Sequence, residues 1–97
     1  MAKILIVEDL ESDTETLRTI LTKAGYTCQC FPSAAGALES ARQDRPDLFL
    51  IDIMLPGGTS GFELCRRVRR DRELTMIPVL IVSAMRHDEE VAHGLCL

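Results

Sequence analysis

Short apolar runs alternate with segments of helical spacing along this chain, and this alternation constrains the fold more than any other feature. The apolar runs lie at residues 4–7, 26–31, 48–53 and 79–84, and all but the second are apolar at nearly every position. Continuous runs of this length are typical of parallel strands that are buried on both faces. The alternation therefore predicts an α/β fold, a doubly wound parallel sheet with helices on both faces.

The segments between the runs carry apolar residues three or four positions apart, as an amphipathic helix requires. We expect helices over about residues 11–24, 32–43, 62–70 and 88–95. The apolar stripe of the first helix is Leu17, Ile20, Leu21 and Ala24. Gly25 follows at a position typical of a helix end. No linker divides the chain, so residues 1–97 are expected to form one domain.

Composition and charge exclude several classes of protein. The net charge is −4, which disfavours direct contact with the phosphate backbone of nucleic acids. No apolar run reaches the ~18 residues of a membrane span, and the N-terminus becomes acidic at Glu8, too early for a signal peptide. We therefore expect a cytoplasmic protein that binds neither nucleic acid nor membrane. The four cysteines lack Cys-x-x-Cys and Cys/His ligand spacings, so we expect four reduced thiols.

Three carboxylates follow or end two of the predicted strands. Glu8 and Asp9 come directly after the first strand, and Asp52 lies at the end of the third. If these strands are neighbours, as in the flavodoxin-like order 2-1-3-4-5, the carboxylates converge at one edge of the sheet. Their mutual repulsion would raise at least one pKa unless a hard divalent cation such as Mg²⁺ compensates it. A cation there would draw phosphate towards Asp52, whose carboxylate is a candidate nucleophile.

Simpler interpretations exist for the single residues of this set. Glu8 and Asp9 alone are explained as well by capping of the helix that follows, and Ser83 alone is an ordinary hydroxyl at the end of the fourth strand. Asp52 is harder to explain this way, because it lies in an apolar segment where burial is costly without a partner or a function. Together the residues predict a phosphoryl site, with Ser83 donating to a phosphoryl oxygen and Ala84 leaving room for the group.

Four motifs closely resemble the receiver domain of two-component response regulators, and the resemblance extends over essentially the whole chain. They lie at residues 4–9, 46–56, 61–66 and 77–84. The resemblance implies that Asp52 is the phosphoacceptor, that Asp9 binds Mg²⁺ directly and that Glu8 acts mainly through water. It further implies a metal contact from the backbone carbonyl of Met54, and a switch role for Ser83.

The resemblance also implies the partner and the kind of activity. The phosphoryl donor would be the phosphohistidine of a sensor histidine kinase or of a histidine phosphotransfer protein. The chain would be a signalling domain rather than an enzyme, catalysing at most its own phosphorylation and dephosphorylation.

Two departures from the family pattern affect these expectations. The loop at residues 57–61 is one residue longer than usual, and the chain stops at Leu97, where the family continues with a lysine-bearing fifth strand and a fifth helix. We therefore expect a truncated receiver domain with strand order 2-1-3-4. Its fourth strand would be an unpaired edge, and part of one sheet face would be uncovered. The resulting hypothesis is self-association through these surfaces.

Alternative functions remain open at this point. A receiver-like scaffold that is not phosphorylated and acts through protein–protein interaction is supported by the missing lysine and opposed by the intact acidic residues. A haloacid dehalogenase-like phosphatase is disfavoured, because Met54 stands where its second acid is needed. A dinucleotide-binding fold is excluded, because no Gly-x-Gly-x-x-Gly motif follows the first strand.

Overall fold

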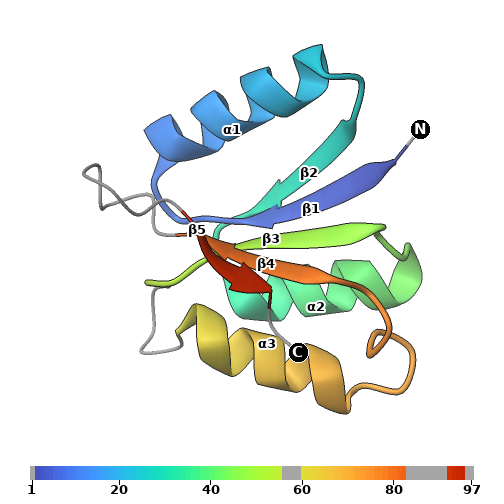
Figure 1. The fold of residues 1–97 in the computed structure, drawn as a ribbon. Coiled ribbons are helices and arrows are strands. Elements are labelled where there is room, and N and C mark those ends of the chain that lie inside the picture. Colours follow the sequence, from blue (N-terminus) through green and yellow to red (C-terminus); the bar gives the residue numbers. More distant parts are fainter. Residues whose placement is uncertain (1, 56–59, 83–91, 96–97) are drawn as a thin grey trace.

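The predicted strands lie side by side in one sheet in the computed structural model of the chain (Figure 1). The structure describes residues 2–55 and 60–82, and the backbone of 92–95. The sheet order is β2-β1-β3-β4-β5, and its first four strands are parallel to one another. The strands are β1 (Lys3–Val7), β2 (Thr27–Phe31), β3 (Leu48–Asp52), β4 (Val79–Val82) and β5 (Ala92–Leu95). The predicted flavodoxin-like order 2-1-3-4 is confirmed.

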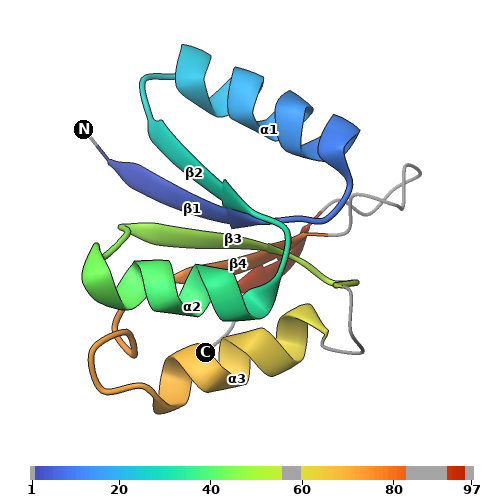
Figure 2. The ribbon, with the colours of Figure 1, turned by 180° about the vertical axis from the view of Figure 1, so that it is seen from behind.

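Helices cover both faces of the sheet. Helix α1 (Glu11–Lys23) lies on one face, and α2 (Ala34–Gln43) and α3 (Gly61–Arg70) lie on the other (Figures 1 and 2). None of the helices in the described ranges is long and apolar enough to cross a membrane.

The strands contribute side chains to two apolar layers because successive residues of a strand point to opposite faces. Leu5 and Val7 of β1 join the larger core under α2 and α3, whereas Ile4 and Ile6 join the smaller core under α1. Phe49 is the largest fully buried side chain of the larger core. Burying a side chain of this kind contributes about 1.5–3 kcal/mol.

The apolar stripe predicted for the first helix differs in detail from the structure. Thr14 is buried in α1, whereas Ile20 of the predicted stripe is 58% exposed. Phe62 at the start of α3 is also half exposed, while Leu64 is fully buried. Gly25 has a φ of 100° after the last turn of α1, as a helix-ending glycine requires.

The C-terminal segment departs from the prediction. Residues 92–95 form β5, antiparallel to β4 with Leu80 opposite Leu95, so the predicted helix is wrong over these residues. The rest of that predicted helix lies outside the described residues. The predicted free edge of the fourth strand is also wrong, because β5 occupies it. The unpaired N–H and C=O groups of an edge strand form hydrogen bonds with an extended segment that lies beside it. The helical spacing of apolar residues in so short a segment favours a helix less strongly than these hydrogen bonds favour a strand.

The cysteines divide into two groups. Cys65 is disulfide-bonded, so the prediction of four reduced thiols is wrong at this position. Cys28 and Cys30 are free, as predicted. They lie two residues apart on β2, and both pack against the core under α1. Cys96 lies outside the described residues.

Candidate functional site

The carboxyl ends of β1 and β3 bring the predicted acidic residues together. The two strands pair in parallel with Val7 opposite Ile51, so the next residues along each strand meet at the same edge of the sheet. One carboxylate oxygen from each of Glu8, Asp9 and Asp52 lies within 4.8 Å of the other two. Glu8 and Asp52 are buried, while Asp9 is exposed. The cluster is therefore accessible to solvent from the side of Asp9.

Glu8 is held in an environment that opposes its negative charge. Its side chain is 4% exposed. Burial raises the pKa of Glu8 to about 7, and the negative charge of Asp52 adds to this, while a hydrogen bond from the backbone N–H of Leu10 works in the opposite direction. That hydrogen bond reaches Oε2 at 3.0 Å. The other oxygen, Oε1, is buried with no hydrogen-bond partner among the described residues.

The alternative role of the acidic pair as a helix cap is not what the structure shows for Glu8. Helix α1 begins after Leu10, whose side chain makes no capping hydrogen bond. Glu8 accepts the N–H of Leu10 itself, which precedes the first helical residue. The Thr14 hydroxyl donates to the Leu10 carbonyl at 3.1 Å and fixes this first turn. Glu8 therefore faces the acidic cluster rather than the helical N–H groups.

Gly61 brings the start of α3 into contact with the backbone of Asp52. A Cβ atom at Gly61 would lie 2.4 Å from the Asp52 carbonyl oxygen, a distance that real side chains do not adopt. The Gly61 N–H donates to the Ile53 carbonyl at 2.7 Å, and the Ser60 hydroxyl caps α3 by accepting the N–H of Glu63 at 3.1 Å. Gly61 had no predicted role, and the available signal in the sequence was its place at the end of a loop rich in Gly.

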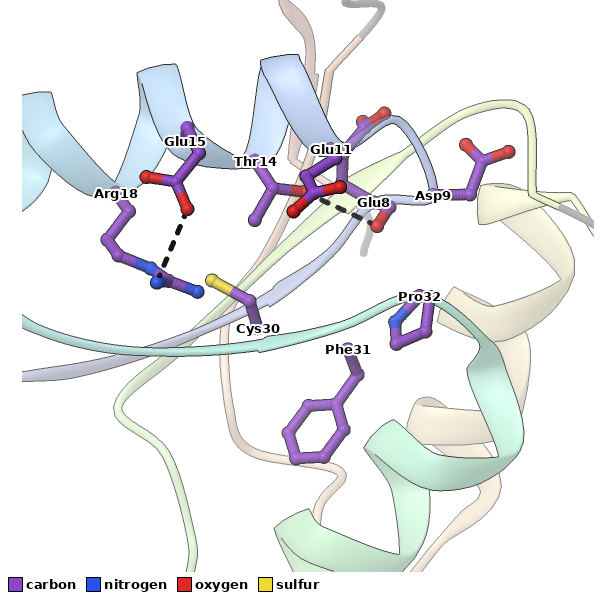
Figure 3. Close-up of a pocket in the computed structure, with 9 residues that line it drawn as sticks. All are labelled: Glu8, Asp9, Glu11, Thr14, Glu15, Arg18, Cys30, Phe31 and Pro32. Atoms are coloured by element: carbon purple, nitrogen blue, oxygen red, sulfur yellow. Dashed lines mark hydrogen bonds and ion pairs between the residues drawn. The ribbon is translucent and has the colours of Figure 1, made fainter.

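A pocket of about 290 Å³ opens beside the cluster, between α1 and the end of β2 (Figure 3). Glu15 and Arg18 form an ion pair in its wall with a separation of 3.6 Å. Among the described lining residues, Arg18 alone is cationic. The lining consists of Glu8, Asp9, Glu11, Thr14, Glu15, Arg18, Cys30, Phe31 and Pro32. Such an acidic wall favours cations over anions near the carboxylate cluster.

Of the remaining predicted site residues, the structure describes Met54 but not Ser83 or Ala84. Met54 is 61% exposed, and its backbone pairs with Ser60 in an isolated bridge. The metal contact of its carbonyl stays a prediction. Ser83 and Ala84 lie outside the described residues, so their predicted roles stay predictions as well.

The donor atoms at this site fit a hard divalent cation. Carboxylate oxygens are the ligands that Mg²⁺ prefers, and it needs only a few because it keeps water in its other positions. Glu8 offers a buried oxygen to which no described residue donates a hydrogen bond, and a cation nearby would offset the repulsion among the three carboxylates.

Comparisons with known proteins agree with this geometry. The sequence profile described as "Response regulator receiver domain" matches residues 4–96. The polar-differentiation response regulator DivK of Brucella ovis is 40% identical over 96 residues, which cover 96% of this chain and 77% of DivK. The chain belongs to the response regulator receiver domain family. The transcriptional regulatory protein AfsQ1 of Streptomyces coelicolor is 37% identical over 95 residues, covering 98% of this chain and 40% of AfsQ1.

Solved receiver structures show the same fold. The chemotaxis response regulator CheY4 of Vibrio cholerae superimposes with a TM-score of 0.79 at 30% identity, over 84% of this chain and 68% of CheY4. This chain covers only part of several longer relatives: 40% of AfsQ1, 38% of the transcriptional regulatory protein CseB of Streptomyces coelicolor and 20% of the response regulator PleD of Caulobacter vibrioides.

The lysines of this receiver domain lie away from its acidic site. Lys3 and Lys23 are the only lysines of the sequence. Lys3 begins β1 and forms an ion pair with Asp44, at the opposite end of the strand from Glu8. Lys23 ends α1. The lysine expected from the family resemblance therefore has no counterpart among the described residues around the carboxylates.

Proposed function

We propose that this receiver domain accepts a phosphoryl group on Asp52 from the phosphohistidine of a sensor histidine kinase or a histidine phosphotransfer protein, with Mg²⁺ as cofactor. The observation that carries the proposal is the approach of the three carboxylates to within 4.8 Å at the ends of two parallel strands. Asp9, Glu8 and Asp52 would hold the metal, together with the backbone carbonyl of Met54. We place this reaction in the cytoplasm.

Asp52 supplies the attacking oxygen in this reaction. A bond forms between its carboxylate oxygen and phosphorus as the bond from phosphorus to the histidine nitrogen breaks, and the histidine leaves with that electron pair. The end of β3 and the contact with Gly61 hold the Asp52 backbone in place. When bound, the divalent cation neutralises the carboxylates and the phosphoryl oxygens. The domain changes its own covalent state and is not a turnover enzyme.

Exposed apolar side chains around the site support a protein as the phosphoryl donor. Leu10 follows Asp9 and is 49% exposed, and Met54 lies two residues after Asp52 and is 61% exposed. Phe62, beside Gly61, is 47% exposed. Large apolar groups gathered around a polar site are typical of a surface that binds another protein.

Phosphoryl uptake tests the proposal. The chain would be incubated with acetyl phosphate, with and without Mg²⁺, and its intact mass recorded. We expect one phosphoryl group per chain that depends on Mg²⁺ and is absent in Asp52→Asn. Asp13→Asn is the matched control, because this carboxylate is close enough to act on Glu8 but is not part of the three-residue cluster. It should be phosphorylated like the wild type.

The second candidate function is a receiver-like scaffold that acts through protein–protein interaction without phosphorylation. Exposed apolar side chains near the site favour it, because they suit a protein-binding surface whether or not Asp52 is phosphorylated. A folded wild-type chain that binds Mg²⁺ but gains no phosphoryl group would support the scaffold and contradict the phosphoacceptor. Self-association through the sheet face under α1, where Leu48 and Leu80 are half-buried, would then be the first interaction to test.

A further inference from the structure

Charges of opposite sign gather on the two sides of the sheet. Residues 8–15 contain five acidic residues and no basic one, whereas residues 66–72 contain five arginines and one aspartate. The acidic segment runs into the start of α1, and the basic segment includes the end of α3. These two helices cover opposite faces of the sheet (Figures 1 and 2). Within one chain the two groups of charges therefore do not neutralise each other by direct contact.

Helix α1 presents a charged stripe on one side. Its members are Glu11, Glu15 and Arg18, which are exposed and line the same pocket, so they share one side of the helix (Figure 3). That pocket also contains residues of β2, and β2 forms one edge of the sheet. Because no described strand lies beyond β2, this side of α1 is open to another molecule.

Helix α3 presents a second charged stripe on its outer side. Leu64 and Val68 are buried on its inner side, whereas Arg66 and Arg70 are exposed and Glu63 is half-buried. Residues three and four apart in a helix are neighbours on its surface. Glu63, Arg66 and Arg70 therefore form one continuous stripe that points away from the sheet.

Ion pairs within α3 neutralise only part of its charge. Arg66 lies 2.9 Å and Arg67 3.7 Å from the carboxylate of Glu63, so two arginines share one acidic group. Arg70 forms no ion pair with any described residue. The outer side of α3 therefore keeps a net positive charge.

The stripe on α1 keeps a net negative charge for the same reason. Glu15 and Arg18 form an exposed ion pair with a separation of 3.6 Å. Glu11 forms no ion pair with any described residue. Exposed pairs within a helix contribute little to stability, so exchanging them for partners on another molecule costs little.

The two stripes are complementary when the helices lie antiparallel. Glu11 and Glu15 are four residues apart, as are Arg66 and Arg70, and four residues advance about 6 Å along a helix. One register then places opposite charges across from each other in three pairs: Arg70 with Glu11, Arg66 with Glu15, and Glu63 with Arg18. The two halves of this match, with the same spacing and opposite order of sign, belong to one chain, which identifies the partner as a second copy.

We propose that copies of this chain associate head to tail, with the α3 stripe of one copy against the α1 stripe of the next. Because α1 and α3 lie on opposite faces of the sheet, a copy that binds one neighbour through α3 keeps its α1 stripe for another. A contact of this kind produces an open chain or a ring of copies rather than a closed two-fold dimer. Exposed ion pairs are weak and screened by salt, so the association is weak and strongest in low salt.

Analytical ultracentrifugation over a wide range of protein concentration tests this association. In about 10 mM salt, where charges act over about 30 Å, we expect the average mass to rise with concentration beyond that of two copies. In about 1 M salt, where this distance is about 3 Å, the chain should sediment as a monomer. A wild type that stays monomeric in low salt, or whose mass stops at two copies, would overturn the proposal.

Charge reversal identifies the two surfaces. The double variant Arg66→Glu, Arg70→Glu makes the α3 stripe acidic, and Glu11→Arg, Glu15→Arg makes the α1 stripe basic. Each double variant alone places like charges against each other and should associate at least about tenfold more weakly than the wild type. When the two variants are mixed, every contact between them again joins opposite charges, so association should return.

A control variant and the mixture separate a lost contact from a lost fold. Glu39→Arg reverses an exposed charge of α2 outside both stripes and should associate like the wild type. Circular dichroism and thermal unfolding would show that each variant is folded. Wild-type association in either double variant, as expected for contact through the sheet face under α1, would contradict the proposal, and so would a mixture that stays monomeric.

Discussion

Replacing Glu8 by glutamine should remove a pH dependence of stability that originates at the acidic site. The carboxyl group is buried beside two other acids, and its pKa in the folded chain is about 7 instead of 4.5. The amide introduced by Glu8→Gln would keep an oxygen for the N–H of Leu10, so the substitution removes the titration with little change in shape. The test therefore isolates the ionisation of one side chain.

The sign and size of the effect follow from proton linkage. Because the pKa is higher in the folded chain, the folded state binds the Glu8 proton more tightly than the unfolded state does. The free energy of unfolding therefore falls as the pH rises from 4.5 to about 7, and stays lowered above that. A difference of about 2.5 pKa units at 1.36 kcal/mol each corresponds to about 3 kcal/mol.

Urea denaturation in metal-free buffer at a series of pH values would measure this loss. We expect the difference in unfolding free energy between Glu8→Gln and wild type to grow in favour of the variant by about 3 kcal/mol across that window. Glu39→Gln, which changes an exposed glutamate of α2, is the control and should follow the wild type. Added Mg²⁺ at high pH should stabilise the wild type more than Glu8→Gln. Parallel curves for wild type and Glu8→Gln at all pH values would refute the reasoning.

Two further substitutions test the packing around the site. Gly61→Ala should destabilise the chain by about 1–3 kcal/mol and lower phosphoryl uptake, because the new Cβ meets the Asp52 carbonyl oxygen. Gly36→Ala is the control, because a Cβ at Gly36 finds ordinary contact distances. Equal stability of the two variants would contradict this prediction. Arg69→Ala should cost about 1–3 kcal/mol of unfolding free energy, since its guanidinium donates to the carbonyls of Thr75 and Ile77. An unchanged urea midpoint in Arg69→Ala would show that these hydrogen bonds make no net contribution to the free energy of unfolding.

Much of the fold could be predicted because the signals are local. The run at residues 48–53 is apolar at all but one position, so it predicts a strand buried on both faces, and β3 lies in the middle of the sheet. The prediction failed at residues 92–95, where β5 forms in place of a helix. Four residues beside a strand edge take their structure from the partner available to them rather than from their own spacing.

The acidic site, too, could be predicted from the sequence only in part. Placing Glu8, Asp9 and Asp52 at the ends of strands one and three required only the pattern of apolar runs and a strand order. The raised pKa of Glu8 and the contact between Gly61 and Asp52 could not be predicted in this way. Both depend on how the segments around them are placed in the folded chain.

The sequence by itself determined the order of strands and helices as far as β4, most of the apolar faces and the positions of the carboxylates along the chain, because periodicity and polarity act over a few residues. Only the tertiary structure decided that Glu8 is buried, that α3 starts against Asp52 and that β5 lies beside β4. Burial and close approach arise from contacts between distant segments, and these contacts exist only once the sheet has formed.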